Sequence, residues 1–482
     1  MKYLVLSISH NHWQQAVLID HTLNLLDSGH EVRWVQVSYF GYSPWDDPIS
    51  LFFNNFMNMR KISRIARQIG ANPNFTFEWR SLVVHPFSVM SSPDMAHEVH
   101  GAVNEEVVTI LRDSLPCERH SKKLKRHLSR KFHLANELFL KIIKAADPEI
   151  VIIFNGRFLL ERSAWTASLE CSKRVVFIER FSAQWGDRYY EFHHPVHSVS
   201  ERSLAMLSYA ELLKGAMHLP NSVGGKWFSD RRLALTQKFT SNQTFQFTRP
   251  DWATTVISFF HSSEDELFVS DLSDSSWASQ FEVIRKLIEI CNSRPGHLLV
   301  IRLHPNLLNK SKRELKKWDD FARFFSAPNI VFLMSRDRVN SYSLVDQSDF
   351  VVTSGSTIGV EAAYMRKPSI LCGLAFHQDM GMLEIVRSSE ELKSSLSKIY
   401  SPAVLESRAD ISLKYALFLA RAGIKVKNLT VVGNPYIQDP WYEGFGVQFK
   451  PFRLASLIRK IESSCYSKFQ IARTCNCDAR PS

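Results

Sequence analysis

The chain has 482 residues, of which 45% are hydrophobic and 22% are charged, and its net charge is +11 at neutral pH. This composition is typical of a globular protein, and the length suits two domains of about 200 residues each. The longest apolar runs are far shorter than the roughly 18 residues of a membrane-spanning helix, which argues against a transmembrane protein.

The cysteines and the first residues indicate the compartment. Seven cysteines form no disulfide framework, and the apolar start at residues 1–7 is too short for a signal peptide. Cys475 and Cys477 lie near the end without an accompanying cluster of metal ligands, so we expect no metal site. We therefore expect a cytoplasmic protein.

Strand and helix patterns alternate in the first half of the chain. Strands are predicted at residues 3–7, 31–37, 150–154 and 174–178, and a helix at residues 14–26. Residues 41–145 are expected to be mostly helical. Strands that alternate with helices through short connections are typical of a parallel, doubly wound sheet.

The second half repeats this pattern after a polar, turn-rich stretch at residues 242–250. Strands are predicted at residues 254–260, 297–303, 329–334, 349–353 and 368–372, with helices at residues 279–291 and 357–365. Residues 451–469 carry apolar side chains at helical spacing, and we expect this helix to pack on the first domain rather than on a membrane. The predicted domains are residues 1–245, 246–425 and a tail at 426–482.

A run of small residues joins the strand at 349–353 to the next helix. The loop is Thr353-Ser354-Gly355-Ser356-Thr357, and Glu361 follows one helical turn later. Free amides at a helix start bind phosphate, and a carboxylate one turn further could accept hydrogen bonds from ribose hydroxyls. The alternative is a helix cap at Ser356 or Thr357 with a solvated Glu361.

Two other strands of this half are predicted to end at the same edge. Arg302 and His304 lie at the end of one, and Ser262 and Ser263 follow the other. Ligands of open α/β sheets bind outside the carboxyl ends of the strands, and an imidazole can donate to a phosphate. We predict that these side chains join residues 354–357 and Glu361 in one donor-binding site.

These residues resemble a known family of enzymes. His304-Pro305, Ser356-Thr357 and Asn155-Gly156-Arg157 with Glu179-Arg180 resemble GT-B glycosyltransferases of bacterial capsule and lipopolysaccharide biosynthesis. The resemblance implies two Rossmann-like, doubly wound domains that face each other across a cleft. Residues 1–245 would bind the acceptor and residues 246–425 a nucleotide-sugar donor, with no further cofactor.

The sequence departs from the family pattern at two points. Many retaining members have Glu eight residues before the helix Glu, where this chain has Thr353, and no Asp-x-Asp occurs. Both departures favour an inverting, metal-independent transfer. Such a reaction needs a base, and Glu179 and His10 each lie at the end of a predicted strand. Arg157 and Trp185 are the predicted acceptor contacts, while a surface ion pair for Glu179 and a structural tie for Arg157 are the alternatives.

The positive charge is confined to two segments. Residues 118–131 carry a net charge of +6 and residues 450–482 carry +5, which leaves the remainder near neutral. Without a recognisable motif or interleaved aromatic residues, we do not expect nucleic-acid binding. The segments are either solvated faces or sites that dock on an anionic membrane surface or on a phosphate-bearing lipid acceptor, at the inner face of the membrane.

The leading hypothesis is a glycosyltransferase that extends a surface polysaccharide or a lipid-linked glycan. The alternatives are a sugar-nucleotide 2-epimerase of the same fold and a noncatalytic subunit of polysaccharide assembly or export.

Overall fold

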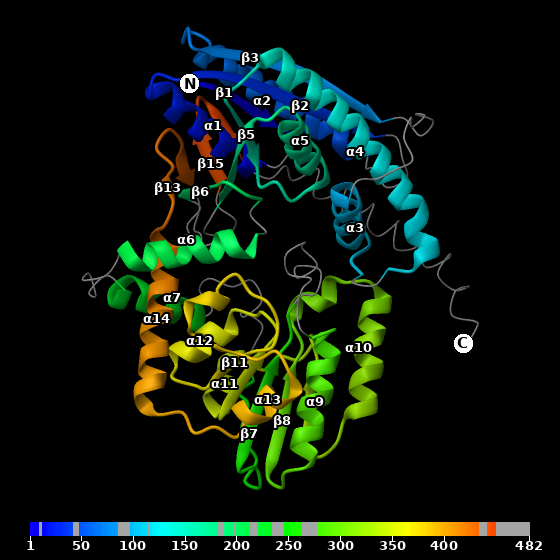
Figure 1. Cartoon of the computed structure of the whole chain (residues 1–482), viewed down its shortest axis with the longest axis vertical. Coiled ribbons are helices and arrows are strands. Elements are labelled where there is room, and N and C mark those ends of the chain that lie inside the picture. The colour runs from blue at the N-terminus through cyan, green and yellow to red at the C-terminus, as the bar shows by residue number, and fades with distance from the viewer. Residues whose placement is uncertain are drawn as a thin grey trace.

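The computed structural model describes residues 1–8, 12–41, 48–84, 97–113, 116–180, 187–195, 198–212, 220–233, 245–262, 277–432 and 441–449. Its strands form a seven-stranded sheet in the first half, a six-stranded sheet in the second half and a small three-stranded sheet (Figure 1). In the described residues, no helix is both long and apolar enough to cross a membrane.

The seven-stranded sheet has the order β3-β2-β1-β4-β5-β6-β13. Its first five strands in this order are parallel, whereas β6 pairs antiparallel with β5 and β13 pairs antiparallel with β6. The strands are β1 (Lys2–Ser7), β2 (Glu31–Gly41), β3 (Phe75–Val84), β4 (Ile150–Phe154), β5 (Arg174–Arg180), β6 (Arg188–Phe192) and β13 (Ile424–Lys425). The chain order reverses between β1 and β4, so the topological switch point of a Rossmann sheet lies there.

Helices cover both faces of this sheet. Leu4 and Leu6 of β1 pack in one core cluster, and Val5 between them packs in another, because successive side chains of a strand point to opposite faces. The first cluster contains α4 (Glu118–Ala146) and α5 (Leu159–Glu170), and the second contains α1 (His12–Asp27) and α2 (Pro48–Ile69). Strand β4 is buried along its whole length, as expected for a strand covered on both faces.

The prediction for residues 41–145 is only partly correct. Helices α2, α3 (His97–Leu111) and most of α4 lie there, but so does β3, which pairs in parallel with β2 from Phe75 to Val84. This edge strand buries only three of its side chains and exposes Arg80. Its sequence therefore lacks the continuous apolar run that marks the inner strands.

The six-stranded sheet is entirely parallel, in the order β9-β8-β7-β10-β11-β12. Its strands are β7 (Thr255–Phe260), β8 (His297–Arg302), β9 (Ile330–Leu333), β10 (Phe350–Thr353), β11 (Ser369–Leu371) and β12 (Glu384–Ile385). Every strand predicted in this half is present. The order reverses between β7 and β10, which places a second switch point there.

Six α-helices of the described residues belong to this half. They are α9 (Gln280–Asn292), α10 (Lys312–Phe325), α11 (Ser341–Gln347), α12 (Ile358–Tyr364), α13 (Ser389–Ser395) and α14 (Pro402–Arg421). Helix α9 begins as predicted, because the Ser279 side chain accepts a hydrogen bond from the Glu282 amide. The two sheets with helices on both faces confirm the predicted α/β class of two Rossmann-like, doubly wound units.

After α14 the chain returns to the first sheet. It forms β13, and then β14 (Thr430–Val432), β15 (Trp441–Gly444) and β16 (Val447–Phe449) pair as the small antiparallel sheet. The Asp20 carboxylate on α1 accepts hydrogen bonds from the backbone amides of Lys427 and Asn428, at 2.9 and 2.6 Å. The amphipathic helix predicted at residues 451–469 lies outside the described residues.

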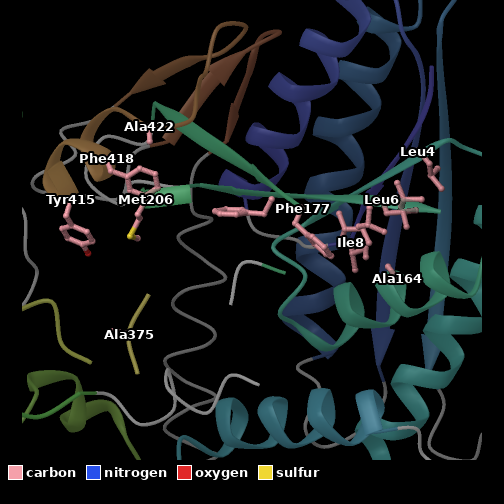
Figure 2. Close-up of a cluster of buried hydrophobic side chains, with 14 of the residues drawn as sticks. Leu4, Leu6, Ile8, Ala164, Phe177, Met206, Ala375, Tyr415, Phe418 and Ala422 are labelled. Carbon is pink, nitrogen blue, oxygen red and sulfur yellow. The ribbon is translucent and has the colours of Figure 1, made fainter. Parts of the chain in front are cut away.

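A continuous apolar cluster joins the two halves. It runs from Leu4 and Phe177 of the first sheet to Phe418 on α14 and Ala375 after β11 (Figure 2). Met206 contributes from α6 (Val199–Leu212), which with α7 (Gly225–Arg232) precedes the second sheet. Burial of one cluster by both halves stabilises their contact.

The halves meet again at the opposite side, next to α10. The Ser311 amide donates to the Arg112 carbonyl oxygen at 3.0 Å, and the Arg112 guanidinium donates to the Asn309 carbonyl oxygen at 3.0 Å. Arg112 follows α3, and residues 309–311 follow β8. The carboxyl ends of the second sheet therefore face the first half of the chain (Figure 1).

Candidate functional site

Three neighbouring strands end in polar residues at the switch point of the second sheet. The register pairs Phe260 of β7 with Thr353 of β10 on one side and with Arg302 of β8 on the other. His261 therefore lies beside Ser354 and close to His304. Ligands of open α/β sheets bind at this position, so the structure brings the predicted strand ends together. Ser263 lies outside the described residues.

His261 and His304 are linked through the backbone. The His304 amide donates to Nδ1 of His261 at 3.3 Å, and the Asn306 amide donates to Nδ1 of His304 at 3.1 Å. A neutral imidazole that accepts at Nδ1 carries its proton on Nε2. Burial, reinforced by His304 and two lysines, lowers the pKa of His261 to about 3. His261 is therefore a neutral hydrogen-bond donor at neutral pH.

Three buried polar atoms at this switch point have no hydrogen-bond partner among the described residues. They are Nε2 of His261, Oγ of Ser262 and Oγ of Ser354, whose residues are 3%, 6% and 4% exposed. An unsatisfied buried polar atom costs about 1–3 kcal/mol, and native proteins contain few of them. Their concentration on adjacent strand ends indicates a binding site for a polar ligand.

Thr353 shapes the loop between β10 and α12. Its hydroxyl accepts hydrogen bonds from the amides of Gly355 and Ser356, at 3.3 and 2.8 Å, and donates to the Phe260 carbonyl oxygen. These two amides are therefore not free for phosphate, contrary to the sequence-based expectation for the loop. Gly355 has a φ of 147°, which favours glycine, and Thr357 is the N-cap residue that precedes α12.

Glu361 lies in a buried ion pair that the sequence did not reveal. Its Oε1 accepts hydrogen bonds from Nε and Nη2 of Arg231, at 3.0 and 2.7 Å, and Oε2 accepts one from the Tyr342 hydroxyl. The residue is 2% exposed, so the alternative of a solvated Glu361 is wrong. Burial lowers the pKa of Arg231, but Glu361, together with Tyr342 and Tyr415, outweighs this effect and raises the pKa. The ribose contact of Glu361 stays a prediction.

Arg302 is also engaged within the protein. Its guanidinium donates to the carbonyl oxygens of Met334 and Asp337, at 2.7 and 3.0 Å, and the residue is 2% exposed. Arg302 thus supports the loop that follows β9. Its Nε, however, is buried without a hydrogen-bond partner among the described residues, and the predicted contact with a donor stays a prediction.

The first sheet contributes the turn after β4 and the end of β5. Asn155 and Gly156 have φ values of 59° and 76°, and a Cβ at Gly156 would collide with the Phe177 ring. This turn directs the Asn155 side-chain amide to the Glu179 carboxylate, to which it donates a hydrogen bond. The Arg157 amide in turn donates to Oδ1 of Asn155 at 3.0 Å. Glu179 is thus oriented by a neighbouring strand end, as suits a candidate base.

Other predicted residues of the first half are placed differently or lie outside the described residues. His10 and Trp185 are outside them, so their catalytic and acceptor roles stay predictions. Tyr189, four residues after Trp185 in the chain, is fully buried and accepts a hydrogen bond from Asn24 at 2.9 Å. Tyr189 therefore belongs to the core and is not available to a sugar.

The sequence also missed residues that the fold brings to the site. His261 had a usable signal, because it directly follows a predicted strand that ends at the same edge as His304. Arg231 and Tyr342 gave none, because they reach Glu361 from other helices.

Two facing Rossmann-like sheets with polar strand ends at the switch points define a GT-B-like α/β protein. Residues 269–395 match the family model of capsule polysaccharide biosynthesis proteins. This segment contains His304, the loop at residues 353–357 and Glu361. The resemblance that was drawn from these motifs is therefore confirmed over that part of the chain. No curated protein sequence matches the chain.

Solved structures of similar fold include both epimerases and transferases. A UDP-GlcNAc 2-epimerase from Neisseria meningitidis is 10% identical, with 95% of this chain and 99% of that chain covered and a TM-score of 0.29. The β-Kdo 2,4-transferase KpsC from Thermosulfurimonas dismutans is 15% identical, with coverages of 61% and 81% and a TM-score of 0.36. The calicheamicin glycosyltransferase CalG4 is 12% identical, with coverages of 86% and 94% and a TM-score of 0.27. At these identities the likeness concerns the fold alone.

Proposed function

We propose that the protein is a glycosyltransferase of capsule polysaccharide biosynthesis. It would transfer a sugar from a nucleotide-sugar donor to a growing surface polysaccharide or a lipid-linked acceptor. The observation that carries this proposal is the set of unsatisfied donors and hydroxyls of His261, Ser262 and Ser354 at the switch point of the second sheet. The family match over residues 269–395 includes Ser354 and supports the same assignment.

The donor phosphates would lie against these strand ends. Nε2–H of His261 and the hydroxyls of Ser262 and Ser354 are neutral donors, and buried donors of this kind stabilise the negative charge that develops on a departing diphosphate. His304 and residues 355–357 border the same position. The nucleoside would extend toward Glu361.

The transfer itself would be a single displacement. Glu179 accepts the proton of the acceptor hydroxyl while the oxygen of that hydroxyl bonds to the anomeric carbon. The bond from the anomeric carbon to the donor phosphate breaks, and its electron pair leaves on the nucleotide. A displacement from the opposite face inverts the configuration. The orientation of Glu179 by Asn155 supports this role.

We further propose that the reaction needs no metal ion. The proposal rests on the sequence, which lacks the Asp-x-Asp pattern of metal-dependent transferases of another fold. Neutral hydrogen-bond donors at the strand ends would take over the charge stabilisation that a metal otherwise provides.

The basic face of α4 is proposed to dock on an anionic membrane surface that holds the acceptor. Lys122, Lys123 and Arg126 are exposed, whereas Leu124 and Leu128 on the other face pack in a core cluster. The helix therefore offers charge without an insertable apolar face. Each basic residue near such a surface contributes about 1 kcal/mol. The second basic segment, residues 450–482, lies outside the described residues.

A thermal-shift panel of UDP-, GDP-, CMP- and dTDP-sugars tests the donor site. A ligand at 100 times its Kd adds about 2.7 kcal/mol to the stability, so the cognate donor raises Tm. Glu179→Gln should retain this shift and lose transfer to the acceptor. The double variant Ser262→Ala/Ser354→Ala should lose most of the shift.

The panel also separates the alternatives. Turnover of the donor without any acceptor would indicate a 2-epimerase. Absence of a shift with every nucleotide sugar would contradict the proposed transferase and favour a noncatalytic role in assembly.

A further inference from the structure

Gln280 makes two hydrogen bonds to a single residue beside the end of β7. Its Oε1 accepts a hydrogen bond from the Ser262 amide at 2.8 Å, and its Nε2 donates to the Ser262 carbonyl oxygen at 2.9 Å. Gln280 is the first residue of α9, and Ser262 lies two residues after the end of β7. The side chain therefore binds both backbone groups of a residue that is 18 positions away in the chain.

Both partners of this contact are buried. Gln280 is 4% exposed and Ser262 is 6% exposed. Buried backbone N–H and C=O groups need a partner, and a primary amide offers an acceptor and a donor to one residue at once. Gln280 thus does for Ser262 what a neighbouring strand does for the residues within β7.

The start of α9 fixes the position of Gln280. The Ser279 hydroxyl accepts a hydrogen bond from the Glu282 amide at 3.3 Å, and the Glu282 carboxylate accepts one from the Ala278 amide at 2.8 Å. These two bonds close the first turn of α9 on itself, as in a capping box. The backbone that carries Gln280 is therefore held in place.

The neighbouring backbone groups at the end of β7 are bound as well. The Phe260 carbonyl oxygen accepts from the Thr353 hydroxyl at 3.2 Å, and the His261 amide donates to the Arg302 carbonyl oxygen at 3.0 Å. By contrast, Nε2 of His261 and Oγ of Ser262 have no hydrogen-bond partner among the described residues. The protein therefore fixes the backbone of this strand end, whereas two side-chain hydrogen-bond donors remain for a ligand.

We propose that Gln280 is a positioning residue that holds the Ser262 hydroxyl against the phosphates of the nucleotide sugar. This inference rests on the proposed function, in which that hydroxyl donates to the departing diphosphate. One rotatable bond separates a serine hydroxyl oxygen from the backbone, so a backbone that is fixed at its amide and its carbonyl confines the oxygen to a few positions. Prearranged hydrogen-bond donors stabilise developing negative charge without reorganisation during the reaction. Gln280 acts through Ser262 and is not itself a contact of the nucleotide sugar.

A double-mutant cycle in ligand affinity tests this role. Gln280→Met has a similar volume and removes both hydrogen bonds, whereas Ser262→Ala removes the hydroxyl that they position. Affinity is measured by calorimetry for the compound that gives the largest thermal shift among UDP-, GDP-, CMP- and dTDP-sugars. Ser262→Ala should weaken binding by about ten- to a hundredfold, since it removes a hydrogen bond to a charged group, and Gln280→Met should weaken it by a similar factor. The double variant should bind no more than about threefold more weakly than Ser262→Ala alone, because both changes act on the same contact.

Asn55→Leu is the matched control. Asn55 on α2 is 5% exposed, and its side-chain amide donates to the Tyr39 carbonyl oxygen of β2 at 2.8 Å. It therefore holds a strand backbone as Gln280 does, but in the first half of the chain. Urea unfolding should show a loss of stability in both Asn55→Leu and Gln280→Met, whereas the affinity for the nucleotide sugar should fall only in Gln280→Met.

The outcomes separate the role of Gln280 from the proposed function. Equal affinity in folded Gln280→Met and wild type, or losses that add fully in the double variant, would overturn the positioning role, while binding by the wild type would leave the donor site intact. If Gln280→Met is not folded, the cycle is made with Gln280→Asn, whose amide is one methylene shorter and withdraws from Ser262. If the wild type binds none of the nucleotide sugars, the proposed function fails, and the role of Gln280 fails with it.

Discussion

Replacement of Glu361 by alanine should cost about 3–5 kcal/mol of unfolding free energy, because it leaves a buried arginine without its counter-charge. The side chains of Arg231 and Glu361 are 18% and 3% exposed, and the guanidinium makes two hydrogen bonds to one carboxylate oxygen. Hydrogen bonds to charged groups contribute about 1.5–3 kcal/mol each, which agrees with that range. The Tyr342 hydroxyl loses its acceptor as well.

Urea unfolding of a double-mutant cycle measures this cost. Arg231→Met combined with Glu361→Ala should be more stable than Glu361→Ala alone, because no unpaired charge then remains buried. Glu406→Ala is the matched control. Glu406 pairs with Arg366, which follows α12, and both side chains of this ion pair are more than half exposed. That control should cost no more than about 1 kcal/mol. If Glu361→Ala costs no more than Glu406→Ala, the buried pair does not hold α7 on α12.

The same carboxylate tests the ribose contact. Glu361→Gln removes the charge and keeps the shape, so a ribose contact predicts that donor affinity falls by about 1–3 kcal/mol in calorimetry. Unchanged affinity in a folded Glu361→Gln would leave the carboxylate with its structural role alone.

Four further predictions concern the site, the basic helix and the buried histidines. His304→Ala should lower both turnover and Tm, because the His304 side chain also caps a short 3-10 helix. His304→Asn should keep the cap and the Tm but lose turnover. Equal turnover in His304→Asn and wild type would contradict a contact of His304 with the donor. Transfer should proceed in EDTA, and activity that is abolished by EDTA and restored by Mg²⁺ or Mn²⁺ would refute the metal-independent reaction. The protein should co-sediment with anionic but not with neutral liposomes at low salt, and neutralisation of basic residues on α4 should reduce this binding. Absence of binding at low salt would show that α4 does not dock on a membrane. The variants carry substitutions at Lys122, Lys123, Lys125 and Arg126. Burial lowers the pKa of three histidines to about 3 or 4, so below pH 6.5 the unfolded chain binds more protons than the folded chain. The free energy of unfolding should therefore fall as the pH drops from about 6.5 toward those values. The expected loss is about 1.4 kcal/mol per pH unit for each histidine. Unfolding free energies that stay constant between pH 7 and 5 would contradict their neutral burial; the three are His21, His261 and His377.

The second half of the fold could be predicted from the sequence because its signals are local. Strands β7, β8 and β10 are short apolar runs, and each ends where polar residues begin. The helix after β10 could be placed for the same reason. The edge strand β3 could not, because its polar side chains satisfy no buried-strand pattern and its pairing with β2 is decided by tertiary contacts.

The chemistry of the site was only partly predictable, since several key contacts join residues that are far apart in the chain. Arg231 and Glu361 are 130 residues apart, and no spacing rule connects them. The sequence located the carboxylate correctly but did not reveal its buried ion pair with Arg231. In the same way, the loop at residues 353–357 was predicted to bind phosphate through amides that the Thr353 side chain occupies.

The segment between the two sheets contacts the second half through α6 and α7. The Ser203 hydroxyl on α6 donates to the Phe376 carbonyl oxygen at 3.0 Å, and Arg231 on α7 pairs with Glu361 on α12 at 2.7 Å. Glu361 lies in the helix that follows the donor loop, so a displacement of α7 would weaken the charge environment of that loop. Because both helices also contact α14, whose chain continues into β13 of the first sheet, the connection between the halves and the electrostatics of the donor site depend on the same elements.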